Sequence, residues 1–337
     1  MTSPPDLPRA MKCLERAFGA AASRARLEAP IDGAINRTYP VVVDDVRFAL
    51  RCRVDENGFR YEKGVAKSAL VGAIHAAKRA GASDGAAAAA KPDGIAPPHA
   101  PALAYWSHGD EFWPLPWEVA RWCPGHALGA QDADPSAAAL ERAAFAIADI
   151  HAVTFEGGSA DLLGLAGPKA EFSDWIGAAI ARELGRGPVE ARIERYARDT
   201  VASAKGDVRW TLVHNDLHGL HLIHDPTDGR IGIIDWDNAL VAPAELEFVK
   251  LKHWTRVDRQ SGHLSGDAPR YAAIVSAYAA RTGRALDAAV FRACEALWLL
   301  RVWRFENERR QSGRPTPKLF AGPDIYRDTL DRLARAA

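Results

Sequence analysis

The feature of this sequence that most constrains its fold is a series of three short apolar runs between Trp210 and Ala239. The runs are "TLV", "HLI" and "IGII", and polar turn residues, including an Asp-Gly pair, separate them. Apolar runs this short, bounded by turn signals, predict β-strands rather than helices. Because the surrounding segments are patterned as helices, we expect a small strand–loop–strand unit inside a helical region.

Elsewhere the sequence predicts a β-rich first third and an α-rich remainder, which meet near residues 118–125. Helical spacing of apolar residues, strand-like alternation and turn signals define the expected elements. These are a helix over Pro8–Ala22, a hairpin of "TYPVVV" and "RFALRCR", a helix from about Tyr61 to Ala77, an Ala/Gly/Pro-rich loop over 81–101, two short strands before Pro124, a long helix over Ala288–Arg310 and a final short helix. Two lobes of α+β character with a short connector are therefore expected.

Four histidines, His214, His218, His221 and His224, lie within eleven residues of the strand–loop–strand unit. On one helix, spacings of four and three would place imidazoles on a shared face, as a zinc site requires. Gly219 and the flanking apolar runs indicate a strand–loop–strand instead, on which the histidines are expected to point to different sides. A zinc hydrolase that depends on His218 or His224 remains an alternative.

Two carboxylates suit a different chemistry. Asp216 lies in the loop after "TLV", and Asp235 follows "IGII" nineteen residues later. In phosphoryl transfer, one such carboxylate accepts the proton of a hydroxyl group, and another holds Mg²⁺ against the nucleotide phosphates. The pattern therefore favours a phosphotransferase, in which both side chains serve one cation-containing site.

The segments "VHNDLHGLHLIHD" and "IGIIDWDNALVAPAELEFVKL" resemble the catalytic loop and the metal-binding segment of the aminoglycoside phosphotransferase-like (protein-kinase-like) small-molecule kinases. The similarity runs from about Ile31 through the late helices and is most specific over residues 212–249. It implies an α+β, bilobal protein-kinase-like fold. A small β-rich N-lobe (1–118) and a larger, mostly helical C-lobe (126–337) would flank a hinge (119–125).

The resemblance also implies roles for individual residues. Asp216 matches the catalytic aspartate that orients the acceptor hydroxyl, and Asp235 matches the metal-binding aspartate. His214 matches the histidine that braces the catalytic loop, and Glu247 matches the acid that ties the following helix to it. Asp237 is either a second carboxylate of the metal or substrate region or a solvated turn residue.

The sequence departs from the family pattern at His221, where the family has a metal-binding asparagine. A neutral imidazole is a poor ligand for Mg²⁺ and a better one for Mn²⁺ or Zn²⁺. Three outcomes stay open: His221 binds an ion and favours Mn²⁺, Asp235 works with water ligands, or the site is impaired. A nucleotide-binding pseudokinase that acts through partners is the corresponding alternative function.

If the first lobe is kinase-like, as the resemblance implies, the stretch "DGAINRTYPVVV" would supply a turn over the nucleotide phosphates, and a cation should follow on the next strand. Gly33 would allow close approach, and Asn36 would lie at the tip. A plain hairpin turn is the alternative. Arg51 on the following strand is the candidate phosphate-binding cation, because a guanidinium grips phosphate oxygens bidentately, and Arg53 is its rival. Glu62 is a weak candidate for the helix carboxylate that would pair with this cation.

The stretch "WEVARWCPG" resembles the connector of the family. Main-chain groups near Arg121 and Cys123 would meet the edge of the nucleotide base, so the side chains do not distinguish ATP from GTP. The expected cofactor is ATP or GTP with Mg²⁺, or with Mn²⁺ if His221 binds the ion.

Composition limits the partners. Lys plus Arg and Asp plus Glu both number 43, so no net charge recruits nucleic acid or a membrane. The four cysteines form no CxxC pair, which suits a cytoplasmic protein. The expected substrate is a neutral or weakly charged hydroxylated antibiotic, nucleoside-type, aminocyclitol or otherwise glycosylated, with resistance as the outcome. The oligomeric state stays open.

Overall fold

The computed structural model describes residues 6–32, 36–54, 99–101, 103–107, 109–130, 135–153, 171–205, 208–257, 264–313 and 323–337. The chain forms two compact units. The first unit comprises Met1–Pro124, Phe155–Gly164 and Gly232–Asp237, and the second comprises Gly125–Thr154, Leu165–Ile231 and Asn238–Ala337. The expected helix over Tyr61–Ala77 lies outside the described residues, as does most of the Ala/Gly/Pro-rich loop.

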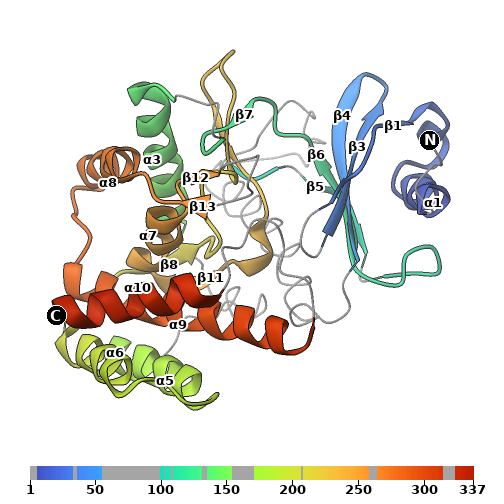
Figure 1. Ribbon diagram of the computed structural model, residues 1–337. Helices are drawn as coiled ribbons and strands as arrows, with labels where there is room; N and C mark the ends of the chain where they lie inside the picture. The colour runs from blue at the N-terminus through green and yellow to red at the C-terminus, as the bar shows by residue number, and fades with distance from the viewer. Residues whose placement is uncertain are drawn as a thin grey trace. The chain divides into compact units, whose positions relative to one another are not determined.

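The first unit is built on a six-stranded sheet with the path β1-β3-β4-β6-β5 (Figure 1). The sixth strand, β2, pairs with β3. Its elements are α1 (Leu7–Phe18), the 3-10 helix η1 (Gly19–Arg24), β1 (Arg26–Leu27), β2 (Ile31–Asp32), β3 (Asn36–Val43), β4 (Val46–Arg53), β5 (Leu103–Ser107) and β6 (Trp117–Arg121). The predicted hairpin is confirmed as β3 and β4, which pair antiparallel, and the two predicted short strands are β5 and β6.

The β3–β4 hairpin turns at Asp44 and Asp45, whose φ angles are 48° and 64°. Two consecutive positive φ values are the requirement of the two-residue turn whose twist matches that of paired strands, and aspartate tolerates this region better than most residues. Pairing of Val43 with Val46 closes the turn. This register fixes every later pair in the hairpin, including the one that contains Arg51.

Helix α1 packs against β4 and buries Ala10, Cys13 and Leu14 in the core of the first unit. The helix predicted over Pro8–Ala22 was too long, because the α-helix ends at Phe18. Gly19 takes a φ of 57°, which an α-helix cannot contain, and the chain continues as the 3-10 helix η1.

The second unit is mostly helical. Its helices are α3 (Ala137–His151), α5 (Phe172–Leu184), α6 (Ala191–Ser203), α7 (Ala244–His253), α8 (Ala268–Thr282), α9 (Ala288–Gln311) and α10 (Pro323–Ala336). Its short strands are β7 (His126–Ala127), β8 (Trp210–Val213), β9 (Leu222–His224), β11 (Leu240–Pro243), β12 (Arg256–Val257) and β13 (Leu264–Ser265). The strand β10 (Ile231–Ile233) and the 3-10 helix η2 (Trp236–Asn238) lie where the chain passes from one unit to the other.

Helix α9 is the central element of this unit and confirms the predicted long helix almost to the residue. The Asp287 side chain caps its first turn by accepting hydrogen bonds from the amides of Ala289 and Val290. It packs against α5, α6, α7 and α10, and its neighbour α10 runs alongside it at the red end of the chain (Figure 1). Buried residues on α9, such as Leu297, share one core cluster with Leu246 of α7, so α9 fixes the helix that carries Glu247 and Lys250.

The three apolar runs form β8, β9 and β10, as the sequence predicted. Within the second unit, β8 pairs antiparallel with β11, and β7 pairs antiparallel with β9. Neither β7 nor β11 was expected. Across the part of the chain that the structure describes, no helix is both long and apolar enough for a membrane span.

Candidate active site

In the second unit, Asp216 lies in the loop that follows β8. Pairing of Val213 with Leu240 brings the residues just before β11 alongside this loop. Asn238 donates a hydrogen bond from Nδ2 to Asp216 Oδ2 (3.1 Å), and Asn215, whose φ is 58°, donates from Nδ2 to the Asn238 carbonyl (3.1 Å). The pairing of β8 with β11 therefore sets the position of the Asp216 carboxylate.

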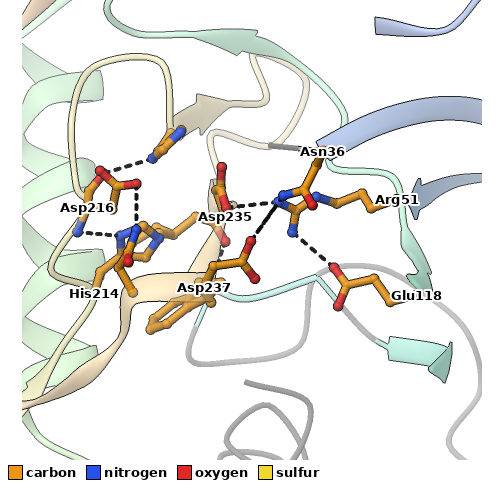
Figure 2. Close-up of polar contacts among 11 residues, drawn as sticks. Asn36, Arg51, Glu118, His214, Asp216, Asp235 and Asp237 are labelled. Atoms are coloured by element: carbon orange, nitrogen blue, oxygen red, sulfur yellow. Dashed lines mark hydrogen bonds and ion pairs between the residues drawn. The ribbon is translucent and has the colours of Figure 1, made fainter. Parts of the chain in front are cut away.

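His214 and Glu247 hold the backbone of the same loop. His214 is buried, and its Nδ1 accepts a hydrogen bond from the Asp216 amide at 3.2 Å (Figure 2). The His214 amide in turn donates to Glu247 Oε2 at 2.5 Å. Because the carboxylate comes from α7, one hydrogen bond ties the start of the loop to the helical core.

Lys250, one helical turn beyond Glu247 on α7, forms an ion pair with Asp216 Oδ1. Both side chains are mostly buried, with 13% of Lys250 and 16% of Asp216 exposed. The Lys250 ammonium also lies 4.4 Å from the centre of the Trp254 ring. Burial alone would lower the pKa of Lys250 to about 7, but the direct ion pair with Asp216 opposes that shift and favours the charged ammonium.

The expectation that the histidines point to different sides is wrong for three of them. The ring centroids of His218 and His221 are 3.8 Å apart, and those of His214 and His221 are 5.7 Å apart. Asp216, His218 and His221 each offer a potential ligand atom within 4.8 Å of the others. His224 lies apart from this group on β9, in the strand pair with β7.

Hydrogen bonding decides which of these imidazoles suits a metal. His221 Nδ1 lies 2.8 Å from the Asp216 carbonyl, which only accepts, so Nδ1 carries the proton and Nε2 carries the lone pair. His218 Nδ1 accepts from the Leu220 amide, and His214 Nδ1 accepts from the Asp216 amide. The neutral forms of His218 and His214 therefore carry their protons on Nε2. Burial, with smaller contributions from His221 and then His214, also lowers the pKa of His218 well below its ordinary value. This donor set fits one imidazole ligand, from His221, and does not fit a zinc triad.

In the first unit, Arg51 on β4 is the centre of a charged cluster (Figure 2). Its Nη2 lies 2.8 Å from Asp235 Oδ1 and 3.3 Å from Asp237 Oδ2, and its Nη1 lies 3.0 Å from Glu118 Oε1. Asn36 Nδ2 donates to the same Asp237 oxygen at 3.1 Å. The structure thus brings together four residues that the sequence singled out and adds Glu118; the four are Asn36, Arg51, Asp235 and Asp237.

Sheet register explains this cluster. Arg51 pairs with Thr38 on one side and with Glu118 on the other, so Glu118 is a direct cross-strand partner. Burial disfavours the guanidinium cation, but Asp235, Asp237 and Glu118 outweigh it and hold the pKa of Arg51 above its ordinary value. Asp235 itself has a φ of 67°, a region that costs a non-glycine residue energy and is often found at functional sites.

The carboxylate oxygens of Asp235 and Asp237 are hard donors of the kind that Mg²⁺ takes. They reach the cluster from the turn after β10 and have the same Arg51 nitrogen as a neighbour. This donor set fits a divalent cation. Asp216 and Asp235 belong to different units, and their convergence on one ion stays a prediction.

The remaining predicted residues fall in several places. The Arg121 guanidinium lies 4.9 Å from the centre of the Phe48 ring, and Cys123 is buried, which raises the pKa of its thiol to about 12. The Arg53 carbonyl accepts a hydrogen bond from Trp113 Nε1. Two further predicted residues, Gly33 and Glu62, lie outside the described residues.

Sequence reasoning missed Glu118, Asn238 and Lys250. Glu118 opposes Arg51 only once the β4–β6 register is known, and Asn238 depends on the β8–β11 pairing. Lys250 could have been found from its position on the helix after "APA", because it follows Glu247 by three residues and therefore lies on the same face.

Comparison with known proteins places these observations in a family. The sequence model of a phosphotransferase enzyme family matches residues 26–289. The chain has no match among curated proteins. The family match is the one that the resemblance of the catalytic loop predicted.

Solved structures show which fold the chain shares. Macrolide 2'-phosphotransferase MphH from Brachybacterium faecium is 15% identical, with a TM-score of 0.61 and 99% of each chain covered. The GDP and kanamycin complex of APH(2")-IIia is 14% identical, with a TM-score of 0.62 and coverage of 96% of this chain and 98% of the other. A thermostable mutant of APH(4)-Ia with ADP and hygromycin B is 16% identical, with a TM-score of 0.59 and coverage of 97% and 98%. The predicted α+β, protein-kinase-like fold class is confirmed.

Proposed function

Because the chain belongs to the phosphotransferase enzyme family, we propose that it transfers the γ-phosphate of ATP or GTP to a hydroxyl group of a small hydroxylated antibiotic. Proteins of similar fold are named for macrolides and aminoglycosides, and solved complexes contain GDP or ADP. The outcome for the cell would be antibiotic resistance. The observation that carries the proposal is the presence of both acids, Asp216 and Asp235, at their loop positions inside the matched region.

Asp216 would orient the acceptor hydroxyl and accept its proton. Its environment supports this role, since Asn238 fixes one carboxylate oxygen and the His214–Glu247 contact holds the loop backbone. A base that is held in this way contributes by geometry, because little covalent chemistry is required of the protein in phosphoryl transfer.

In the first unit, Asp235 would hold the divalent cation, with Asp237 as a second carboxylate, and Arg51 would bind nucleotide phosphate. Glu118 holds one side of the guanidinium at 3.0 Å and so pre-orients the planar group. The ion would neutralise charge on the phosphates when bound. His221, which belongs to the second unit, would supply an imidazole nitrogen, and this donor suits Mn²⁺ better than Mg²⁺. Gly33 and Asn36 would cover the phosphates, and main-chain groups near Arg121 and Cys123 would contact the base.

The test is a screen of nucleoside, aminocyclitol, aminoglycoside and macrolide antibiotics with ATP and with GTP, in which gain of a phosphate is followed by mass. Asp216→Asn and Asp235→Asn are the informative variants, since each keeps the size of the side chain and removes its charge. We expect each to lower kcat at least about a hundred-fold in a protein that still folds, as cooperative thermal unfolding would show. Glu111→Gln, at an exposed side chain, is the matched control and should leave kcat unchanged.

Other outcomes would point elsewhere. Nucleotide binding without transfer to any acceptor, with either Mg²⁺ or Mn²⁺, would indicate a pseudokinase. Stoichiometric zinc in the purified protein, together with an activity that is lost in His218→Ala or His224→Ala, would indicate a zinc hydrolase. Either result would overturn the proposal.

A further inference from the structure

The proposed function gives no role to the ion pair between Lys250 and Asp216. Both oxygens of the Asp216 carboxylate have partners: Oδ1 pairs with the Lys250 ammonium, and Oδ2 accepts from Asn238. The proposed base therefore shares its surroundings with a positive charge supplied by the protein itself.

The position of this ammonium is built by more than one contact. Its second neighbour, the Trp254 ring, is buried, and the Trp254 amide donates to the Lys250 carbonyl at 2.8 Å. The ring packs edge-on against His218 and Trp298, with centroid distances of 5.9 Å and 5.2 Å. A cation above an aromatic face is attracted to it, so a locked ring and a carboxylate together hold the Lys250 charge next to Asp216.

Stability alone gives a poor account of this arrangement. Removing an ammonium from water is costly, and a buried ion pair is often no more stabilising than apolar residues of similar size. A methionine at this position would reach the Trp254 ring without that cost. The placement of a cation is better explained by what it does to groups that approach Asp216.

We propose that Lys250 is a positioning residue that selects the acceptor, so that the enzyme favours hydroxyl groups whose neighbouring substituents are neutral or anionic over those that carry an ammonium group beside the hydroxyl. This inference rests on the proposed function, because it assumes that the acceptor hydroxyl binds at Asp216. It narrows the substrate class to nucleoside-type and other glycosylated molecules that carry no ammonium group beside the acceptor hydroxyl.

The selection follows from like-charge repulsion. An acceptor that binds its hydroxyl to Asp216 must place the substituents on adjacent carbons within a few ångströms of the carboxylate, where Lys250 already lies. A second ammonium there would meet Lys250 in a mostly buried site, in which solvent screens charge weakly. A neutral hydroxyl or amide meets no such repulsion, and an anionic group would be attracted.

The test compares matched acceptors that differ in one charge. Kanamycin, hygromycin B and each further acceptor from the antibiotic screen that carries an amine are assayed beside their N-acetylated forms, which keep the hydroxyls and lose the positive charge. We expect wild-type protein to show a kcat/KM at least about ten-fold higher for the acetylated member of a pair. Lys250→Gln, which keeps a donor for Asp216 without the charge, should reduce this preference to about two-fold or less, and Lys250→Arg should retain it.

Lys252→Gln is the matched control. Lys252 lies on the same helix and also makes an ion pair and a cation–π contact, but its partners are Glu295 and Phe291, so the wild-type preference should persist. If Lys250→Gln does not fold, Lys250→Met provides the same comparison. Equal use of both members of a pair by wild type, or an unchanged preference in the uncharged variants, overturns the inference and leaves the proposed function standing. Transfer to no acceptor at all overturns both.

Discussion

The guanidinium of Arg51 lies 2.8 Å from Asp235 Oδ1 and is held on its other side by Glu118, at 3.0 Å. One mostly buried cation thus links the proposed metal-binding aspartate to the sheet of the first unit. A guanidinium in that position competes with a metal ion for Asp235 and is itself available to phosphate oxygens. Substitutions at Arg51 test its role in binding phosphate.

We expect Arg51→Met to weaken nucleotide binding by about ten- to a hundred-fold, the range for loss of a charge-assisted hydrogen bond. Two carboxylates that Arg51 partly neutralises would then repel the phosphates as well. Arg51→Lys should recover only part of the affinity, because an ammonium lacks the planar fork. Calorimetric titration with ATP and with GTP measures the nucleotide affinity of both variants. Nucleotide affinity that is unchanged in Arg51→Met contradicts this role.

His221 is expected to set the metal preference. With its Nδ1 hydrogen bonded to the Asp216 carbonyl, its Nε2 carries the lone pair that would bind an ion. His221→Asn replaces that nitrogen by an amide oxygen, which suits Mg²⁺ better. The ratio of kcat/KM with Mn²⁺ to that with Mg²⁺ should therefore fall several-fold in the variant. A ratio equal to that of wild type would remove His221 from the metal site. Treatment with a chelator should abolish transfer in both proteins, and added Mn²⁺ should restore it.

Glu247→Ala is expected to destabilise the second unit. The substitution leaves the buried His214 amide without the carboxylate that lies 2.5 Å from it, and loss of such a bond costs about 2 kcal/mol. Urea unfolding gives the free energy directly. Glu194→Ala is the control: Glu194 makes an exposed i,i+4 ion pair with Arg198, whose loss should cost about 0.5 kcal/mol or less. Equal effects of the two substitutions would mean that the Glu247 contact does not secure the loop.

Gly219 allows the catalytic loop to pass close to other backbone. A Cβ at this position would lie 2.2 Å from the Thr255 carbonyl oxygen and 2.5 Å from the Gly129 Cα, so backbone would have to move. We expect Gly219→Ala to lower the free energy of unfolding by more than about 2 kcal/mol. Gly177→Ala is the opposite case, because its Cβ would meet only Val201 Cγ1 at 3.6 Å within α5. Alanine there should stabilise the protein by roughly 0.5–1 kcal/mol. Similar losses at both sites would contradict the close approach at Gly219.

The close approach of backbone at Gly219 also explains why the arrangement of the histidines was not predicted from the sequence. The strands β8, β9 and β10 and the helix α9 followed from local patterns of apolar residues, which are properties of a single segment. The histidines were expected to scatter because a strand–loop–strand alternates its side chains. A turn between His218 and His221, closed by a hydrogen bond of 2.9 Å, brings their rings together instead. Its shape depends on Gly129 and Thr255, which are distant in sequence.

The ion-pair partners of the site residues were also missed by prediction from the sequence. The family resemblance singled out Asp216 and Asp235, which lie in recognisable motifs. It pointed to Arg51 only from its place on the strand expected to carry the phosphate-binding cation. Their partners Lys250 and Glu118 come from other elements, and a contact between elements depends on register and helix rotation. Sequence patterns report which face of an element is buried, but they do not report which residue lies opposite it.

Glu306 on α9 is expected to make the stability of the folded protein depend on pH. Its side chain is fully buried, and neither carboxylate oxygen has a hydrogen-bond partner within the described part of the chain. Burial raises its pKa, and Arg309 only partly opposes the shift. A pKa that is higher in the folded than in the unfolded state means that the folded state binds the proton more tightly. The resulting stabilisation is complete below the unfolded pKa and is lost as pH rises toward the folded value, by up to about 1.4 kcal/mol per pH unit.

Glu306→Gln removes this titration while keeping the shape of the side chain. The stability of the variant relative to wild type should therefore increase as pH rises from 4 to 8, whatever its absolute value. Urea unfolding of both proteins across this range measures the difference, and the fixed cost of burying an amide cancels from its slope. A difference that stays constant with pH would show that Glu306 ionises in the folded protein as it does in the unfolded chain.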